Sequence, residues 1–348
     1  VLEWFRDMLG LPPGTGGLLT SGGSGASLMA LVAARHAVLA DHVTGAVIYA
    51  SAETHSAVER AAWITGFPRT AYRKVPVDGE HRIDVQALSA VLEFDRSQGL
   101  RPFMIVGNAG TTNTGAIDPL LELGALARKE NLWFHVDAAY GGFAAITERG
   151  RTALQGMETA DSWALDPHKW LFQGIECGSV LLRRPDALRD AFHIMPDYLQ
   201  DIDRGQAEPN FADHGLQLSR TARALKVWLS LKAFGLAAFR DAVDRGLDLA
   251  ELAEARITQH PQFELLSPAR LGIVTFRLVR RRPATDPDRL NREALERLNR
   301  SGYGFLSSTR MQGAYALRMC ILSPRTRAED VEGVLERLLQ LAHDIEET

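Results

Sequence analysis

A lysine beside an apolar stretch is the first candidate for chemistry in this chain. Lys169 lies between His168 and the apolar residues 170–172, directly after a predicted strand. Lysine is rarely buried completely, and an amine that loses its hydration becomes a competent nucleophile toward an aldehyde. Taken alone, Lys169 is equally consistent with a side chain that snorkels from a strand end into water. It therefore needs chemical partners elsewhere in the sequence.

Asp137 is the second candidate, because it closes the most apolar predicted strand, residues 132–138. In open α/β sheets, ligands bind at the carboxyl ends of the strands. A buried carboxylate is costly unless it meets a cation or several hydrogen-bond donors. A protonated pyridine nitrogen would serve, and the pairing would make that ring a strong electron sink. A helix N-cap or a plain salt bridge is the alternative. The small Ala138, Ala139 and Gly141 leave room for a flat ring.

Glycines ahead of an apolar helix form a candidate phosphate site. Residues 20–25 (Thr-Ser-Gly-Gly-Ser-Gly) precede the helical pattern of residues 26–40. Glycines before a helix expose backbone N–H groups, and the positive end of the helix dipole favours a phosphate. Such turns are common, so the signal is weak alone. It is not the dinucleotide fingerprint G-x-G-x-x-G, and the Gly-Lys-Ser/Thr of a P-loop is absent.

Two further turns follow predicted strands. His55 comes after the strand at residues 46–50, and its imidazole can stack on an aromatic ring, although a lone histidine at a helix start is more often a cap. Residues 108–118 contain three threonines and small residues that suit close approach to a ring, and a plain turn is the alternative. In chain order, the Gly-rich turn, His55, this turn, Asp137 and Lys169 fit one cofactor from all sides.

Predicted strands alternate with helical patterns over most of the chain. The expected strands are residues 46–50, 103–108, 132–138, 161–165, 178–182, 272–278 and 315–321. The expected helices between the first six strands are residues 54–65, 85–94, 119–130, 185–192, 221–234 and 236–258. This alternation predicts an α/β fold with a mostly parallel sheet. A later change of pattern predicts a large domain over residues 1–235 and a small C-terminal α+β domain over residues 236–348.

The composition gives no support to several classes of function. Hydrophobic residues make up 46% and charged residues 24% of the 348 residues, as in ordinary globular proteins. A net charge of −4 gives no argument for nucleic acid or an anionic membrane. We expect no membrane helix, no signal peptide and no metal. Only Cys177 and Cys320 are present, which favours a reduced, cytoplasmic setting. The chain opens at Val1 within a helical pattern, so we expect that an upstream segment has been removed.

Six stretches together resemble one family. The set resembles the group II pyridoxal-phosphate decarboxylases, which are relatives of aromatic-L-amino-acid decarboxylase with the type I (aspartate aminotransferase-like) fold. The likeness runs from Trp4 almost to the C-terminus, and the pair HVDAAY and PHKW is highly specific. The matching stretches are residues 20–27 (TSGGSGAS), 54–61 (THSAVERA), 110–118 (GTTNTGAID), 135–140 (HVDAAY), 161–170 (DSWALDPHKW) and 225–228 (LKVW).

The resemblance implies pyridoxal 5′-phosphate (PLP) as the cofactor and an amino acid as the substrate. Lys169 would form the Schiff base, Asp137 would bind the pyridinium nitrogen, and His55 would stack over the ring. The resemblance further implies that the phosphate is held by Gly23, Ser24, Ser162 and His168. It implies that Thr112 and Ala139 line the ring and that Asp118 supports the turn. It also implies a homodimer with the active site at the subunit interface.

Two departures from the family's pattern affect the chemistry. Many relatives have Asn where this chain has Asp166, near the phosphate, and a carboxylate there would repel a phosphate unless it points away or pairs with an arginine. The family's lid corresponds to residues 199–216, and the lid tyrosine of animal and plant relatives falls on Phe211. A phenol there can protonate the α-carbon after CO₂ leaves, whereas a phenyl ring cannot. His214 and Tyr198 are therefore the candidate proton donors.

Three functions stay open on the sequence. The first is decarboxylation of an L-amino acid, aromatic or related, to its amine and CO₂ through Lys169. The second is decarboxylative oxidative deamination to an aldehyde, which goes with Phe at the lid position in plant relatives and so with Phe211. The third is a trimmed, non-catalytic chain that cannot form the active dimer. Ser219, at a pocket position that varies between Gly and Ser in relatives, hints at a polar substrate ring.

Overall fold

The computed structural model describes residues 1–194 and 210–347, in two compact units. The first unit comprises Val1–Ala109 and Ile117–Leu236, and the second comprises Gly110–Ala116 and Ala237–Thr348. The sequence-based division had placed residues 110–116 in the large domain. This segment groups with the second unit because Asn113 accepts hydrogen bonds there, from Thr275 Oγ1 to its backbone oxygen (3.2 Å) and from Thr309 Oγ1 to its side-chain oxygen (3.0 Å).

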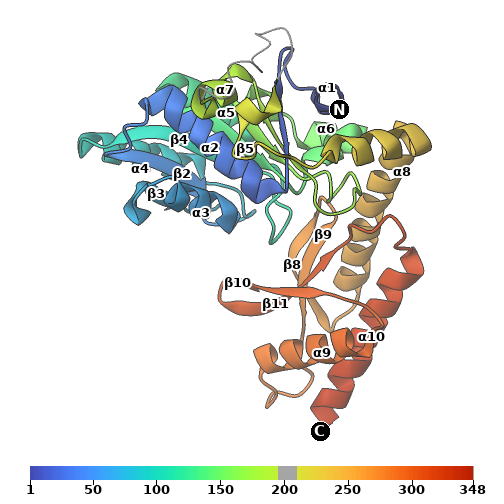
Figure 1. Cartoon of the computed structure of the whole chain (residues 1–348). Helices are drawn as coiled ribbons and strands as arrows, with labels where there is room; N and C mark the ends of the chain where they lie inside the picture. Colours follow the sequence, from blue (N-terminus) through green and yellow to red (C-terminus); the bar gives the residue numbers. More distant parts are fainter. Residues whose placement is uncertain (195–209, 348) are drawn as a thin grey trace. The chain divides into compact units, whose positions relative to one another are not determined.

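The first unit is built on a seven-stranded sheet with the order β1-β7-β6-β5-β4-β2-β3 (Figure 1). The strands from β3 across to β6 pair in parallel, and β7 is antiparallel to both β6 and β1. The predicted mostly parallel sheet is thus confirmed. The strands are β1 Gly16–Thr20, β2 Ala46–Ser51, β3 Tyr72–Val75, β4 Arg101–Asn108, β5 Trp133–Ala138, β6 Ser162–Leu165 and β7 Gly178–Leu182.

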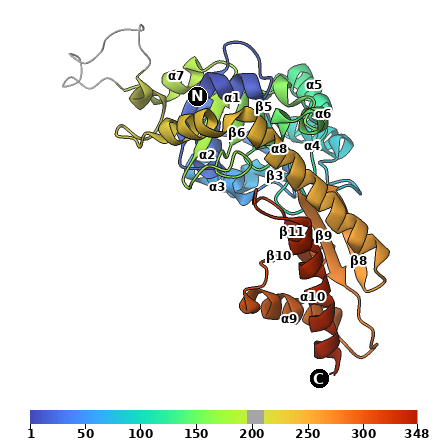
Figure 2. The ribbon, with the colours of Figure 1, turned by 90° about the vertical axis from the view of Figure 1, so that its right-hand side faces the viewer.

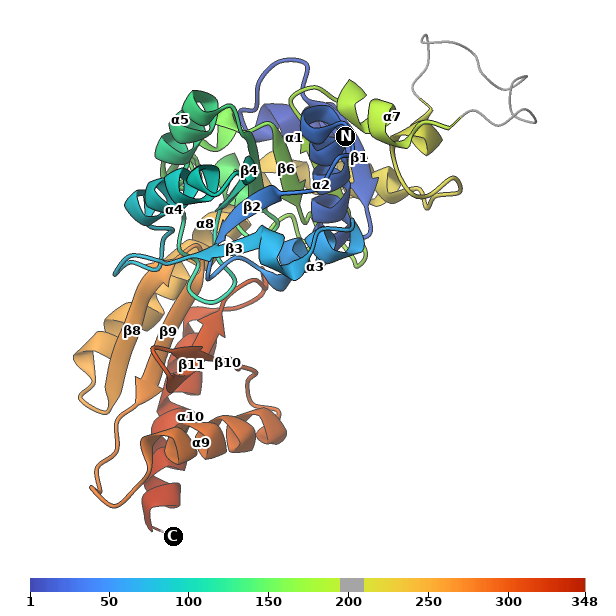
Figure 3. The same ribbon diagram turned by 90° about the vertical axis from the view of Figure 1, so that its left-hand side faces the viewer.

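Helices pack on both faces of this sheet (Figure 3). One face packs against α2 (Gly23–Leu39), α3 (Ser56–Ile64) and α7 (Asp186–Phe192), and the other against α4 (Val85–Ser97) and α5 (Leu120–Glu130). Side chains alternate between the faces of a strand. Ile48 therefore joins the core beneath α2 and α3, whereas Tyr49 donates a hydrogen bond to Asp95 of α4 at 2.8 Å. The shorter helices are α1 (Leu2–Met8) and α6 (Glu148–Ala153).

The carboxyl ends of the parallel strands meet along one edge of the sheet. Asn108 at the end of β4 is in register with Asp137 on β5, and Asp137 is in register with Ala164 on β6. The polypeptide leaves this edge in the turns that carry His55 and Lys169. The fold thus brings together turns that are far apart in the sequence.

The second unit is an antiparallel sheet covered by helices (Figure 2). Its strands, in the order β10-β11-β9-β8, are β8 Phe263–Arg270, β9 Ile273–Leu278, β10 Ser307–Met311 and β11 Ala314–Cys320. Alternate residues of β9 enter the core with α9 (Pro287–Ser301), α10 (Ala328–Glu347) and the later part of α8 (Arg223–Gln259). Gly235 interrupts α8 with φ 75° and ψ 153°, which confirms the predicted break between two helices at this glycine. Among the helices of the two described ranges, none has the length and hydropathy to cross a membrane.

His135 is a titratable group enclosed within β5. Its side chain is 1% exposed, its Nδ1 lies 2.8 Å from Ser162 Oγ, and no group in the described residues bonds its Nε2. Burial lowers the pKa of His135 from 6.5 to about 4. As the pH falls through this window, the unfolded chain takes up the proton first, so folding stability falls with it.

We expect His135 alone to lower the free energy of unfolding by about 2 kcal/mol between pH 7 and pH 5. His135→Asn keeps a polar group beside Ser162 and does not titrate in this range, so the variant should lose correspondingly less stability. Urea unfolding of both proteins at the two pH values measures the difference. Equal losses would contradict a buried neutral imidazole.

Candidate functional site

The carboxylate of Asp137 lies at the end of the central strand β5 and is 8% exposed. Its Oδ1 accepts a hydrogen bond from the backbone N–H of Ala139 at 3.2 Å. Burial raises the pKa of Asp137, while the Ala139 hydrogen bond and the positive charges of Lys169 and His55 oppose that rise. Both side chains therefore lie within electrostatic reach of this carboxylate, and a positively charged ligand group would stabilise it further.

Lys169 lies in the turn after β6. Its Nζ is 3.1 Å from Asp166 Oδ2, and its side chain is 34% exposed. Sequence reasoning anticipated a lysine that loses its hydration, and the structure shows one that is about one-third exposed and ion-paired. The amine is thus accessible, and it is held beside an almost fully buried carboxylate, that of Asp166, which is 5% exposed.

The Gly-rich turn before α2 packs against the Lys169 turn. A Cβ on Gly23 would lie 2.8 Å from Ala139 Cβ and 3.1 Å from Asp166 Oδ2. A Cβ on Gly22 would lie 3.4 Å from His168 Cε1. No side chain caps the N-terminus of α2, so the first backbone N–H groups of this helix can receive an anion. We call the turn of residues 20–25 and the start of α2 the cradle.

His168 faces the cradle with a defined nitrogen. Its Nδ1 accepts a hydrogen bond from the backbone N–H of Cys177 at 3.1 Å. In the neutral ring the proton must therefore be on Nε2, which lies 3.7 Å from Asp166 Oδ2. His168 thus has its N–H donor on the side of Asp166, while its Cε1 lies next to Gly22.

The remaining predicted residues occupy three different settings. His55 caps α3, where its Nδ1 accepts from the Ala57 backbone N–H at 3.2 Å, and its side chain is exposed. Ser24 is exposed in the first turn of α2. Thr112 is exposed and belongs to the segment that groups with the second unit. The structure therefore brings together Gly23, Asp137, Ala139, His168 and Lys169, with His55 near enough to act on Asp137.

Ser162 is a correction to the sequence-based site. It opens β6, at the opposite end of the strand from Asp166, and it is fully buried. Its hydroxyl lies 2.8 Å from Trp133 Nε1 and 2.8 Å from His135 Nδ1. Its place in the DSWALDPHKW motif suggested phosphate contact, but a strand of extended residues carries it away from the cradle. Ser162 holds the sheet interior together instead.

A third buried carboxylate, that of Asp118, supports the neighbouring turn. Asp118 accepts hydrogen bonds at 2.7 Å from the backbone N–H groups of Ile83 and Asn108 and from Asn108 Nδ2. Burial raises the pKa of Asp118 to about 6. Asn108 Nδ2 also lies 3.2 Å from Ser51 Oγ and 3.0 Å from Thr54 Oγ1. Asn108, which sequence reasoning noted only as the start of a turn, therefore ties the ends of β2 and β4 together.

The Leu-Lys-x-Trp motif of α8 braces the loop that follows Lys169. Lys226 Nζ donates to the backbone oxygens of Gly174 and Glu176, both at 3.0 Å. Arg223, which is 3% exposed, forms an ion pair with Glu176, and Ser230 Oγ donates to Gln173 Oε1 at 3.0 Å. The sequence alone gives this motif no role, and its contacts in the structure are structural.

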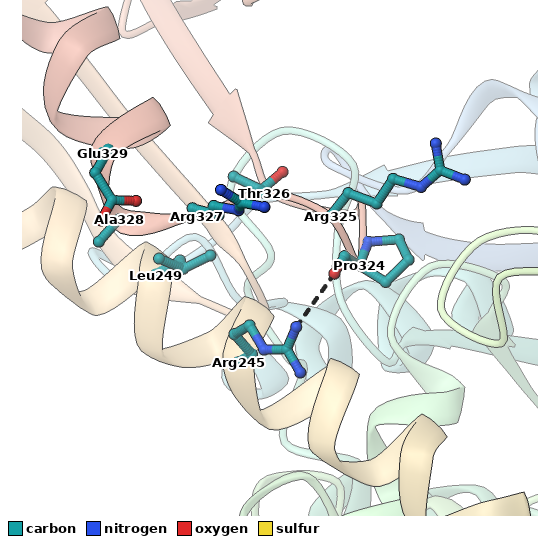
Figure 4. Close-up of a pocket in the computed structure, with 8 residues that line it drawn as sticks. All are labelled: Arg245, Leu249, Pro324, Arg325, Thr326, Arg327, Ala328 and Glu329. Carbon is teal, nitrogen blue, oxygen red and sulfur yellow. Dashed lines mark hydrogen bonds between the residues drawn. The ribbon is translucent and has the colours of Figure 1, made fainter. Parts of the chain in front are cut away.

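A separate pocket of about 670 Å³ lies in the second unit, beside the start of α10 (Figure 4). Arg245 Nη1 reaches toward Pro324 and donates to its backbone oxygen at 3.3 Å. None of the predicted site residues lines this pocket. It is therefore not part of the cluster around Asp137 and Lys169.

The family model of the pyridoxal-dependent decarboxylase conserved domain matches residues 1–279. This chain belongs to the pyridoxal-dependent decarboxylase family. The family recognised from the motifs is thereby confirmed, with PLP as its cofactor and carboxy-lyase chemistry on an amino acid as its activity.

Similar proteins include both decarboxylases and an aldehyde synthase. An aromatic-L-amino-acid decarboxylase of Bacillus atrophaeus is 42% identical over 347 residues, or 99% of this chain and 72% of that relative. A phenylacetaldehyde synthase of Arabidopsis thaliana is 33% identical over 349 residues, or 95% of this chain and 71% of that relative. The crystal structure of Oryza sativa TDC with PLP and tryptamine matches with a TM-score of 0.93 and 29% identity, covering 99% of this chain and 75% of that one.

The residues of this decarboxylase fit the cofactor that its family uses. The backbone of the cradle is accessible at Gly23 because this residue has no side chain. A Cβ there would lie too close to Ala139 and would crowd Asp166. Buried Asp137 is suited to a pyridinium nitrogen, and Lys169 supplies the amine. Asp166 Oδ1 fits a phosphate-bearing cofactor less well, because this carboxylate oxygen is buried without a hydrogen-bond partner among the described residues.

Gly23→Ala should weaken PLP binding by about tenfold or more, roughly 1.4 kcal/mol, because the new methyl group would overlap Ala139 and crowd Asp166. Gly25→Ala is the matched control in the same turn. Its Cβ would meet Ser21 Oγ at 3.5 Å and Thr20 Cβ at 3.7 Å, which are ordinary contacts. An absorbance titration with PLP compares the variants. Equal affinities would show that the cofactor does not lie against Gly23.

Proposed function

We propose that this enzyme decarboxylates an aromatic or related L-amino acid to its amine, with Lys169 as the lysine that binds PLP. The observation that carries the proposal is that a partly exposed lysine, a buried carboxylate and an uncapped helix N-terminus are neighbours. Lys169 lies 3.1 Å from Asp166 and within electrostatic reach of Asp137, and a Cβ on Gly23 would lie 3.1 Å from the same Asp166 oxygen. The name of the Bacillus atrophaeus relative supports the aromatic substrate class.

Each residue would act on a different part of the cofactor and substrate. PLP, when bound, supplies a pyridinium ring that accepts the electron pair left by CO₂. Asp137 would hold the proton on the ring nitrogen, since a buried carboxylate stabilises a cation beside it. The N–H groups of α2 and His168 Nε2–H would hold the phosphate. His55, exposed at the start of α3, would position the substrate over the ring.

Protonation of the substrate's α-carbon needs a donor that Phe211 cannot be. Phe211 and His214 lie in the short helix η6 (Phe211–His214), with ring centroids 6.1 Å apart. His214 Nδ1 lies 2.9 Å from the Asn210 backbone oxygen, which only accepts, so Nδ1 carries a proton and Nε2 is the nitrogen left to exchange one. We propose His214 as the donor. Tyr198, the other candidate, lies outside the described residues.

Oxidative deamination is the second candidate function, and Phe211 favours it together with the 33% identical phenylacetaldehyde synthase. In that reaction the amino acid, O₂ and water would yield an aldehyde, CO₂, ammonia and H₂O₂. The two reactions share the loss of CO₂ and differ in whether the α-carbon is protonated or oxidised. Amine and peroxide therefore distinguish them.

A homodimer in a cytoplasmic setting is part of the proposal. The first part of α8 exposes Leu225, Trp228, Leu229 and Phe234, an apolar surface that suits a second copy of this chain. Cys177 and Cys320 form no disulfide among the described residues, which suits a reducing compartment. The rival hypothesis of a non-catalytic chain predicts that PLP and substrate give no turnover.

The test is a panel of L-amino acids, aromatic ones and histidine included, in which CO₂, amine and peroxide are measured together. We expect CO₂ and amine in equal amounts with an aromatic substrate, no peroxide, and no product of any kind from Lys169→Ala. Peroxide and aldehyde in place of amine would support the second function. Full activity of Lys169→Ala would refute the assignment of the lysine.

A further inference from the structure

The carboxylate of Asp166 faces the cradle. Its Oδ2 lies 3.1 Å from Lys169 Nζ and 3.7 Å from His168 Nε2. Its two oxygens lie 3.1 Å and 3.7 Å from the Cβ positions of Gly23 and Gly22, respectively. The sequence left open whether this side chain points away from the phosphate site or pairs with an arginine. It does neither, because it points toward the glycines and its described ion-pair partners are a lysine and a histidine.

The charges around Asp166 come from three elements. Lys169 and His168 lie in the same turn, Asp137 ends β5, and Cys177 precedes β7. Burial raises the pKa of Asp137 and of Cys177, and the negative charge of Asp166 raises both further. The Lys169 ammonium thus lies close to more than one acidic group, and Asp166 Oδ1 is buried without a hydrogen-bond partner among the described residues.

A phosphate in the cradle would add close to two negative charges beside this carboxylate above about pH 6. Like charges in a poorly hydrated site repel strongly, and the usual relief is that one group takes up a proton. An asparagine amide of the same shape would instead offer the phosphate an N–H donor. The carboxylate of Asp166 therefore opposes phosphate entry by its charge alone.

We propose that Asp166 makes entry of the cofactor's phosphate depend on the uptake of a proton. Before the phosphate enters, the carboxylate holds the Lys169 ammonium at the cradle; when it enters, the proton is shared between Asp166 and the phosphate. The proposal rests on the Lys169 site proposed above. Its consequence is that the affinity for phosphorylated ligands falls as the pH rises, while the affinity for the unphosphorylated ring does not.

The test uses pyridoxine 5′-phosphate and pyridoxine as probes. Both carry an alcohol in place of the aldehyde of PLP, so neither can condense with Lys169. Their affinities are measured by calorimetry at pH 7.0 and pH 8.5. Repetition in buffers of different ionisation heat gives the number of protons taken up. The wild-type enzyme should bind the phosphate ester with uptake approaching one proton and should lose about tenfold in affinity per pH unit. Asp166→Asn should bind it about tenfold more tightly at pH 8.5, with no uptake, and should bind pyridoxine unchanged.

Two control variants separate the causes. Asp161 directly precedes β6, at the opposite end of the strand from Asp166, and its Oδ2 accepts a hydrogen bond from the Phe134 backbone N–H at 2.9 Å. Asp161→Asn should therefore bind both probes as the wild type does. In a Lys169→Ala background, Asp166→Asn should still tighten binding of the phosphate ester. Loss of the effect in that background would show that the variant acts only by freeing the ammonium, which overturns the proposal.

Unchanged proton uptake in Asp166→Asn, or an equal change for pyridoxine and its phosphate, would also overturn the role of Asp166. Failure of the proposed Lys169 site would give a different result, because PLP would then bind without an absorbance change. The affinities of pyridoxine and pyridoxine 5′-phosphate would still report the effect of the Asp166 charge. Thermal melting of each variant confirms that it is folded.

Discussion

At the end of β5, the carboxylate of Asp137 is buried between β4 and β6 and requires a positive charge beside it. Within the protein, Lys169 and His55 lie within electrostatic reach of this carboxylate, and they come from turns after two other strands of the same sheet. The parallel pairing of these strands puts the three groups at one edge. A protonated ring nitrogen would supply a positive charge to Asp137, so the electrostatic need of this strand end and the chemistry of the cofactor coincide.

The surroundings of this carboxylate are made rigid by backbone contacts. Asn108 and Asp118 tie the ends of β2 and β4, and Lys226 of α8 holds the loop after Lys169 through two carbonyl oxygens. The first pair fixes the strand ends and Lys226 fixes the loop after the lysine turn, and a preorganised site loses less free energy when it binds its ligand.

Much of this site could be predicted from the sequence because its residues stand in turns that follow recognisable strands. β7 has the predicted bounds, and the break in α8 falls at Gly235 as expected. The strands that were missed are short, glycine-rich or polar. β8 is one of them, an edge strand that tolerates Pro268 and so did not resemble a strand. Ser162 was misplaced because a motif gives the order of residues and not the end of the strand at which each lies. The direction of the Asp166 side chain was likewise invisible to spacing.

The chain has five lysines, Lys74, Lys129, Lys169, Lys226 and Lys232, and only one of them can carry the cofactor in the proposed site. Reduction of the PLP-loaded enzyme with borohydride makes the link between lysine and cofactor permanent, and mass spectrometry of the proteolytic peptides then locates it. We predict the added pyridoxyl group on Lys169 and on no other residue. A label on Lys226 or any other lysine, or a protein that binds PLP and takes up no label, would contradict the central claim.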